Sequence, residues 1–191
     1  PIQYREMGGQ FSMHMWTSIT VGFIFAFPFI LWEIWKFISP ALYEKEKKYA
    51  ASFIIVSSIL FFIGVLFGYY LIAPLSVQFF ASYIVSPEIS NSIDIDSYMS
   101  LMKTSAIASG LLFELPIIIF FLTKIGLVTP EFLRKYRKYT LVIVLILSAI
   151  ITPPDVISQV IVTIPIMILY EASILISVLV VKSQEREKLK A

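Results

Sequence analysis

The sequence predicts an all-α fold, a polytopic bundle of transmembrane helices, and its composition and charge pattern are the reasons. Of the 191 residues, 58% are hydrophobic and 15% are charged, whereas soluble domains are near half apolar and about a quarter charged. The charges are clustered, which leaves apolar stretches close to the roughly 20 residues that a helix needs to cross a bilayer. Because a lone strand cannot pair its backbone in lipid, these stretches are expected to be helices.

We expect a single transmembrane domain that covers residues 1–191 and contains five helices. A polar segment, residues 1–12, precedes the first helix, and a tail follows the last. The expected helices cover residues 13–38, 51–73, 98–123, 139–151 and 156–181, and the fourth is the shortest. The segments between and after them are residues 39–50, 74–97, 124–138, 152–155 and 182–191. The ten-residue alternation of a barrel strand is absent.

Lysine and arginine fall on alternate segments, which predicts the orientation of the chain. Residues 39–50, 124–138 and the tail 182–191 are basic, whereas residues 74–97 and 152–155 carry acids only. Since basic segments remain in the cytoplasm, we expect a multi-pass protein of the cytoplasmic (inner) membrane with a cytoplasmic C-terminus and residues 1–12 outside. Such a start is consistent with a preceding helix.

Several function classes are disfavoured by what the sequence lacks. There is no cysteine and only one histidine, His14, and the HExxH, GxSxG and P-loop motifs are absent. Asp94 and Asp96 fall in an expected external segment, so they form no intramembrane aspartyl pair. We therefore expect no enzyme, no metal, no cofactor and no nucleic-acid partner, and any work must draw on a source such as the proton gradient.

Two glutamates lie inside expected membrane helices. Glu114 is in SGLLFELPIII and Glu171 is in ILYEASI, where an unpaired carboxylate costs about 2.5–3.5 kcal/mol on insertion scales. For Glu114 we favour a functional contact with another helix or a proton-linked site over an internal hydrogen bond, and for Glu171 both interpretations stay open. Pro116 is expected to kink the helix that contains Glu114.

The segment FISPALYEKEKK, Phe37 to Lys48, forms the first expected cytoplasmic loop. Its lysines follow the positive-inside rule, but Glu44 and Glu46 place negative charge where a cationic peptide could bind. Spacing alone favours solvated ion pairs with the neighbouring lysines. Just before this loop, Glu33 and Lys36 are expected to pair along the helix.

Two turns carry helix-capping patterns. In ITPPDVISQ, Thr152 is expected to cap the last helix, with Pro153 and Asp155 in its first turn. Ser158 and Gln159 lie one turn deeper, where polar side chains would hydrogen-bond across helices. In TPEFL, Thr129 is expected to be a cap followed by Pro130.

Taken together, these segments resemble the TatC family, the core receptor subunit of the twin-arginine protein translocase. They are FISPALYEKEKK, SGLLFELP, GLVTPEFLRKYRKY, and ITPPDVISQ followed by IPIMILYE, in the family's order and over nearly the whole chain. The family has six helices with both termini in the cytoplasm. The resemblance therefore implies that this chain holds helices two to six and lacks the first helix, which carries part of the family's signal-peptide site.

The resemblance implies Sec-independent export of folded proteins, driven by the proton-motive force. Its expected partners are twin-arginine precursors, single-span subunits of the TatA and TatB type, membrane lipid and further copies in an oligomer. The implied signal-peptide residues are Phe37, Pro40, Leu42, Tyr43 and Glu46. Glu114 would face the concave interior, and the implied partner contacts are Thr152, Pro153, Pro154, Asp155, Ser158 and Gln159. Glu33 stands where relatives are expected to carry an uncharged amide.

One alternative from another class stays open. Glu114 and Glu171 could be the proton-coupled groups of a secondary transporter for a small solute. Such folds usually show internal repeats with broken helices in matched positions, and this sequence shows no repeat. A structural membrane anchor would not explain two intramembrane acids.

Overall fold

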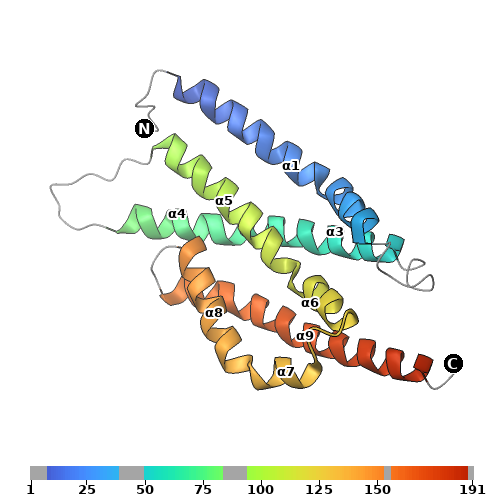
Figure 1. Cartoon of the computed structure of the whole chain (residues 1–191). Helices are drawn as coiled ribbons and strands as arrows, with labels where there is room; N and C mark the ends of the chain where they lie inside the picture. The colour runs from blue at the N-terminus through green and yellow to red at the C-terminus, as the bar shows by residue number, and fades with distance from the viewer. Residues whose placement is uncertain (1–7, 39–49, 84–93, 153–155, 189–191) are drawn as a thin grey trace. The chain divides into compact units, whose positions relative to one another are not determined.

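The computed structural model describes residues 8–38, 50–83, 94–152 and 156–188, nearly all of them helical (Figure 1). Four helical stretches are long and apolar enough to cross a membrane, and they are Gly9–Phe37, Ser52–Ser82, Ile95–Lys124 and Val156–Arg186. The predicted all-α fold of transmembrane helices is thereby confirmed. The chain divides after Gly110 into two compact units, unit 1 (residues 1–110) and unit 2 (residues 111–191), which are described separately.

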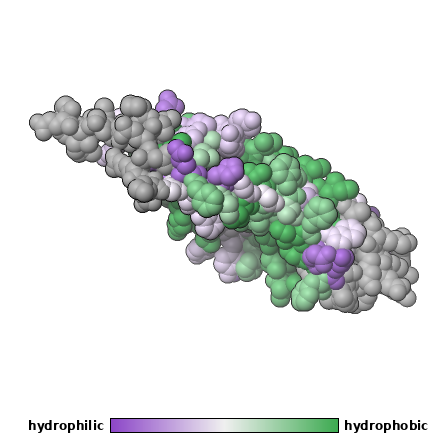
Figure 2. Space-filling view, turned by 90° about the horizontal axis from the view of Figure 1, so that it is seen from above, coloured by the Kyte–Doolittle hydropathy of each residue, from purple (hydrophilic) through white to green (hydrophobic). Residues whose placement is uncertain are grey.

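Large apolar side chains are exposed along the helices. Phe25 and Phe29 are 70% and 76% exposed in unit 1, and Ile150 and Ile168 are 74% and 63% exposed in unit 2. Apolar residues gather in the middle of the face drawn in Figure 2. Exposed apolar surface on this scale marks contact with lipid or protein, which fits helices surrounded by acyl chains.

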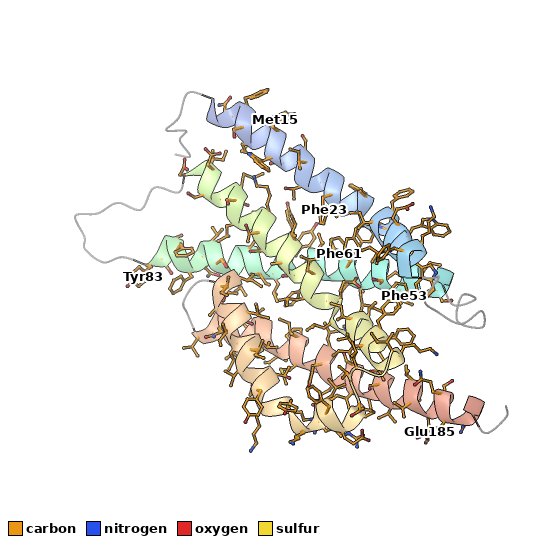
Figure 3. The ribbon with its side chains drawn as sticks, viewed as in Figure 1. Met15, Phe23, Phe53, Phe61, Tyr83 and Glu185 are labelled. Atoms are coloured by element: carbon orange, nitrogen blue, oxygen red, sulfur yellow. The ribbon has the colours of Figure 1, made fainter. Side chains whose placement is uncertain are left out.

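In unit 1, aromatic rings join the first two helices, α1 (Gly9–Ile38) and α3 (Ala50–Phe67). The rings of Phe27 and Phe61 stack with centroids 3.5 Å apart, and Trp35 packs against Phe53 at 5.1 Å. Phe61 is fully buried and lies on the side of α3 that faces α1 (Figure 3). Stacked aromatic pairs of this kind add to the packing of an interface.

The helix does not end at residue 73, where we expected an external loop to begin. A π-helical turn, η2 (Gly68–Ile72), follows α3 and leads into α4 (Ala73–Ser82). Pro74 explains the turn, because a proline has no backbone N–H and its ring clashes with the carbonyl four residues earlier. The Ala73 N–H instead bonds to the Gly68 carbonyl, five residues back, which is the bond that defines a π-helix.

Two glycines allow α5 (Ile95–Phe113) to approach its neighbours within unit 1. A Cβ at Gly68 would overlap with the backbone of Ser105 and Ala106, and a Cβ at Gly110 would lie 2.7 Å from the Phe61 ring. Small residues at a crossing let membrane helices pack closely by van der Waals contact. Gly68 therefore permits a close approach of the two backbones.

At its end, α5 is interrupted. The backbone of Glu114, with φ −75° and ψ −6°, departs from regular helical geometry, and α6 (Leu115–Lys124) begins at the next residue. Pro116 is in the first turn of α6, where its missing N–H leaves no bond unmade. The break is the consequence that Pro116 predicts for this span.

Unit 2 is built around one long helix, α9 (Val156–Lys188), which contacts α6, α7 (Pro130–Lys135) and α8 (Arg137–Ile151). A buried apolar cluster lies between these helices, formed by Ile119, Leu133, Tyr170 and Ile174. With 15 residues, α8 is shorter than a usual membrane span of about 20. Figure 1 shows α8 meeting α9 at one end and α7 at the other.

Candidate functional site

The last turns of α1 lead toward the expected signal-peptide loop. Phe37 is 87% exposed there, while Pro40, Leu42, Tyr43, Glu44 and Glu46 lie outside the described residues. One turn earlier, Lys36 Nζ and Glu33 Oε1 form the predicted pair at 2.7 Å, with side chains 57% and 70% exposed. An ion pair this exposed contributes little stability. The backbone hydrogen bonds of α1, rather than this pair, therefore maintain the end of the helix before the loop.

Glu114 is buried, with 6% of its surface exposed, at the start of α6. Its side chain makes no capping hydrogen bond to that helix. A carboxylate at a helix N-terminus is nonetheless favoured by the helix dipole. The structure thus places this acid in the protein interior, as expected for a membrane-embedded polar group, while its contact with a signal peptide stays a prediction.

Glu171 forms an ion pair with a residue of another helix. Arg137 Nη2 donates to Glu171 Oε2 at 2.6 Å, and both side chains are about half exposed. The pair connects the first residue of α8 to α9. Glu171 therefore has a structural contact between two helices.

The turn between α8 and α9 engages its polar groups within unit 2. Thr152 is buried and ends α8, and both its N–H and its hydroxyl donate to the Ser148 carbonyl at 2.8 Å. Gln159 Nε2 donates to the Leu145 carbonyl at 2.8 Å, which is the predicted bond across helices. Ser158 is also buried. Pro153, Pro154 and Asp155 lie outside the described residues, and with them the rest of the predicted cap at Thr152.

The predicted cap at Thr129 is confirmed. Its hydroxyl accepts the Phe132 N–H at 3.2 Å, and Pro130 is the first residue of α7. This cap begins a helix of only six residues, after which Tyr136 breaks the backbone regularity before α8.

Several contacts that the sequence did not predict fasten α9 to the other helices of unit 2. Thr123 and Ser177 share a buried hydrogen bond of 2.9 Å, Tyr170 donates to the Leu133 carbonyl, and Gln184 donates to the Lys124 carbonyl. Spacing within one segment carries no signal for such pairs, because their members lie 37 to 60 residues apart.

One charged residue could have been noticed from the sequence alone. Lys103 is partly buried in α5, inside a stretch apolar enough to span a membrane. An ionisable residue in such a stretch is a candidate functional residue by default. Within residues 8–38, 50–83, 94–152 and 156–188, no group of three or more His, Cys, Asp or Glu side chains is placed to hold a metal ion.

The helices and their polar contacts define the class of protein. It is a multi-pass membrane protein whose helices are connected by internal hydrogen bonds. Within that class, the family described as Sec-independent protein translocase protein (TatC) matches residues 1–165. The chain belongs to the TatC family, whose members are components of a protein translocase. The predicted family is therefore confirmed.

Individual relatives agree with this assignment. The chain is 45% identical over 183 residues to TatC of Blattabacterium sp. subsp. Periplaneta americana, which covers 96% of this chain and 69% of the relative. It is 43% identical over 160 residues to TatCy of Bacillus subtilis, covering 84% of this chain and 63% of that protein. TatC of Halalkalibacterium halodurans is 37% identical over 191 residues, with 76% of its length covered.

Solved structures give the same result. A crystal structure titled Twin Arginine Translocase Receptor- TatC in DDM matches with a TM-score of 0.78 at 36% identity. The match covers 93% of this chain and 79% of that one. A second crystal structure of the same receptor matches with a TM-score of 0.75. These matches extend the family assignment to the fold.

Proposed function

We propose that this protein is the receptor for twin-arginine signal peptides in Sec-independent export of folded proteins across the cytoplasmic membrane. The likeness at 36% identity to a crystallised twin-arginine translocase receptor, over 93% of this chain, carries the proposal. The receptor makes and breaks no covalent bond, and the proton-motive force supplies the work of transport.

Recognition in this proposal is electrostatic and apolar. The two arginines of a signal peptide pair with carboxylates, chiefly Glu46, because a guanidinium binds a carboxylate through two parallel hydrogen bonds. Phe37, with 87% of its surface exposed at the end of α1, offers an aromatic contact beside them. Pro40, Leu42 and Tyr43 shape the loop between the two, and Glu114 meets polar groups of the peptide or of a partner helix.

The proposal includes the orientation and the partners. The α1–α3 loop, the α6–α7 segment and the C-terminus face the cytoplasm, as the positive-inside rule requires. The external turn at Thr152–Gln159 meets single-span subunits of the TatA and TatB type. Because Thr152 and Gln159 already bond to carbonyls of α8, a partner meets this turn first through exposed side chains such as Val156 and Ile157.

A photocrosslinking experiment on the full-length protein in membranes tests the receptor function. A photoreactive phenylalanine analogue replaces Phe37 or, as a matched control, Phe11, which is 72% exposed at the opposite end of the same helix. The two positions are 26 residues apart, or about 39 Å along a helix. Each variant is offered a precursor with a twin-arginine signal and the same precursor with two lysines.

Crosslinking from position 37 that requires the arginines, together with none from position 11, supports the receptor. Glu46→Gln should then weaken the arginine-dependent product about tenfold, the loss expected for one charge-assisted contact of about 1.5 kcal/mol. Equal products with arginine and lysine signals would overturn the proposed recognition chemistry. Arginine-dependent crosslinking that survives Glu46→Gln would remove Glu46 from the site and keep the receptor.

A further inference from the structure

Aromatic and basic side chains occupy separate outward stripes where α7 turns into α8. We call this region the α7–α8 corner and define it by Phe132, Arg134, Lys135, Tyr136, Lys138 and Tyr139. We propose that the α7–α8 corner binds the headgroup of an anionic phospholipid, with the acyl chains lying along the exposed face of α8. The proposal rests on unit 2 alone and does not depend on the receptor function.

The inward side of the α7–α8 corner is fixed on α9. Leu133 is buried among apolar residues, and its carbonyl accepts the Tyr170 hydroxyl at 2.8 Å. Arg137, four residues later, reaches the same helix and pairs with Glu171 at 2.6 Å. Because one anchor is in α7 and the other begins α8, and both contact α9, they determine which side chains of the two helices turn outward.

An aromatic ladder forms one outward stripe. The ring centroids of Phe132 and Tyr136 are 4.4 Å apart, and those of Tyr136 and Tyr139 are 5.6 Å apart. These residues are 49%, 37% and 65% exposed. The amphipathic rings of Tyr136 and Tyr139 are of the kind enriched at the level of lipid headgroups.

The basic stripe lies beside the ladder. Arg134, Lys135 and Lys138 are exposed, and within the part of the chain that the structure describes none of them has an ion pair. Glu131 is the acid of the same segment, and Glu171 is already taken by Arg137. Lys135 Nζ lies 5.9 Å from the centre of the Tyr136 ring, which brings the two stripes together.

The apolar continuation of the ladder selects a lipid over a soluble anion. Beyond Tyr139, exposed apolar residues follow at helical spacing along α8, with Val142, Ile143 and Ile146 between 54% and 56% exposed. A phosphate ion would use the basic stripe alone. A phospholipid uses both parts, since its phosphate meets the cations and its chains cover this apolar face. The positive-inside rule accounts for basic residues here but not for their alignment with the aromatic ladder.

Native mass spectrometry of the full-length protein in detergent micelles tests the inference. The protein is titrated with phosphatidylglycerol or phosphatidylcholine, and the bound lipid is counted. The test variant is Lys135→Gln with Lys138→Gln. The matched control removes two charges from the end of α9, Lys182→Gln with Arg186→Gln. A third arm adds inorganic phosphate to the original protein.

We expect the affinity of the test variant for phosphatidylglycerol to fall about thirtyfold, because each lysine near an anionic surface contributes about 1 kcal/mol. The affinity of the control variant for this lipid should stay unchanged, and so should the binding of phosphatidylcholine to every variant. Equal losses in both variants, or equal binding of the two lipids, would overturn the inference. Displacement of phosphatidylglycerol by millimolar phosphate would show a site for phosphate alone and would also overturn it. Tyr139→Ala should lower the affinity severalfold without abolishing the preference for the anionic lipid.

Discussion

The helices within unit 1 and the helices within unit 2 are held together by different kinds of contact. In unit 1, ring stacking at Phe27 and Phe61 and the close approach allowed by Gly68 bring the helices together. In unit 2, α9 makes side-chain hydrogen bonds to α6, α7 and α8 and an ion pair to α8. Shape is the main feature of these contacts in unit 1, and matched donors and acceptors are that of the contacts in unit 2.

This difference teaches where each unit is sensitive to change. In lipid the surrounding solvent is as apolar as the helix surfaces, so shape complementarity supplies attraction through many small contacts and fails when one atom overlaps. A hydrogen bond or ion pair can be removed singly, and its net contribution between membrane helices is small, about 0.6 kcal/mol on average. We therefore expect the largest single-substitution effects in unit 1.

The largest expected effect is that of Gly68→Ala. The added Cβ would overlap with the backbone of Ser105 and Ala106, which cannot yield as a flexible side chain does. We expect a loss of about 3 kcal/mol in the free energy of unfolding, measured in mixed detergent–SDS micelles. Gly22→Ala in α1 is the control, since its Cβ would meet no described atom within 4 Å. Equal stability of the two variants would contradict the close approach.

A smaller effect is expected at the buried Thr123–Ser177 bond, 2.9 Å long. A double-mutant cycle with Thr123→Val and Ser177→Ala should give a coupling of about 0.6 kcal/mol, the average found for hydrogen bonds between membrane helices. As the control, Thr20→Val removes a hydroxyl that bonds to Trp16 of its own helix. Coupling near zero would make shape the main determinant in unit 2 as well, and the comparison would fail.

The Arg137–Glu171 pair should contribute less, because both side chains are about half exposed. Arg137→Gln should cost about 0.5 kcal/mol in low salt and less in high salt, since exposed charges are screened. Exchanging the two charges, Arg137→Glu with Glu171→Arg, should recover part of the loss. Lys182→Gln supplies the same charge change at an exposed position. A loss that does not depend on salt and resists the exchange would mean that Arg137 acts by packing.

The smallest expected effect is at Glu33 and Lys36. Glu33→Gln should change the free energy of unfolding by less than about 0.5 kcal/mol, because the pair is exposed and lies within one helix. Unfolding curves at neutral pH that overlap with those of the original protein are the expected result. A loss above 1 kcal/mol in the free energy of unfolding would mean that this pair makes a contact beyond α1. The stability of unit 1 would then depend on polar contacts as well as on shape.

Local features were predictable from the sequence, because their causes lie within a few residues. Thr129 before Pro130 predicts a cap and Glu33 with Lys36 predicts an ion pair, and both are present. Pro116 predicts a kink, and the helix is interrupted two residues before it, at Glu114. The family followed from several short segments in the right order. The signal-peptide and partner contacts stay predictions, and most of the first loop lies outside the described residues.

Contacts between distant segments were not predictable in the same way. The partner of Glu171 is 34 residues away at Arg137, and no spacing rule for one helix selects it. The sequence does not predict the continuation of the helix to Ser82, because Pro74 favours an end there, whereas a π-helical turn accommodates the proline. The sequence around Gly68 does not predict its close contact with α5, because the contact depends on how the two helices pack.

The π-helical turn at Gly68–Ile72 also determines how the following segment responds to insertion and deletion. In η2 five residues close the hydrogen-bonded turn that four residues close in an α-helix, so this turn absorbs one extra residue. Removing one residue from η2 would let an ordinary helix continue into α4 with Ala73 and Ser76, both fully buried, still on the packed side. Removing a residue from an ordinary α-helical turn would instead rotate every later side chain by about 100° around the axis, so a change of length disturbs the packing least at η2.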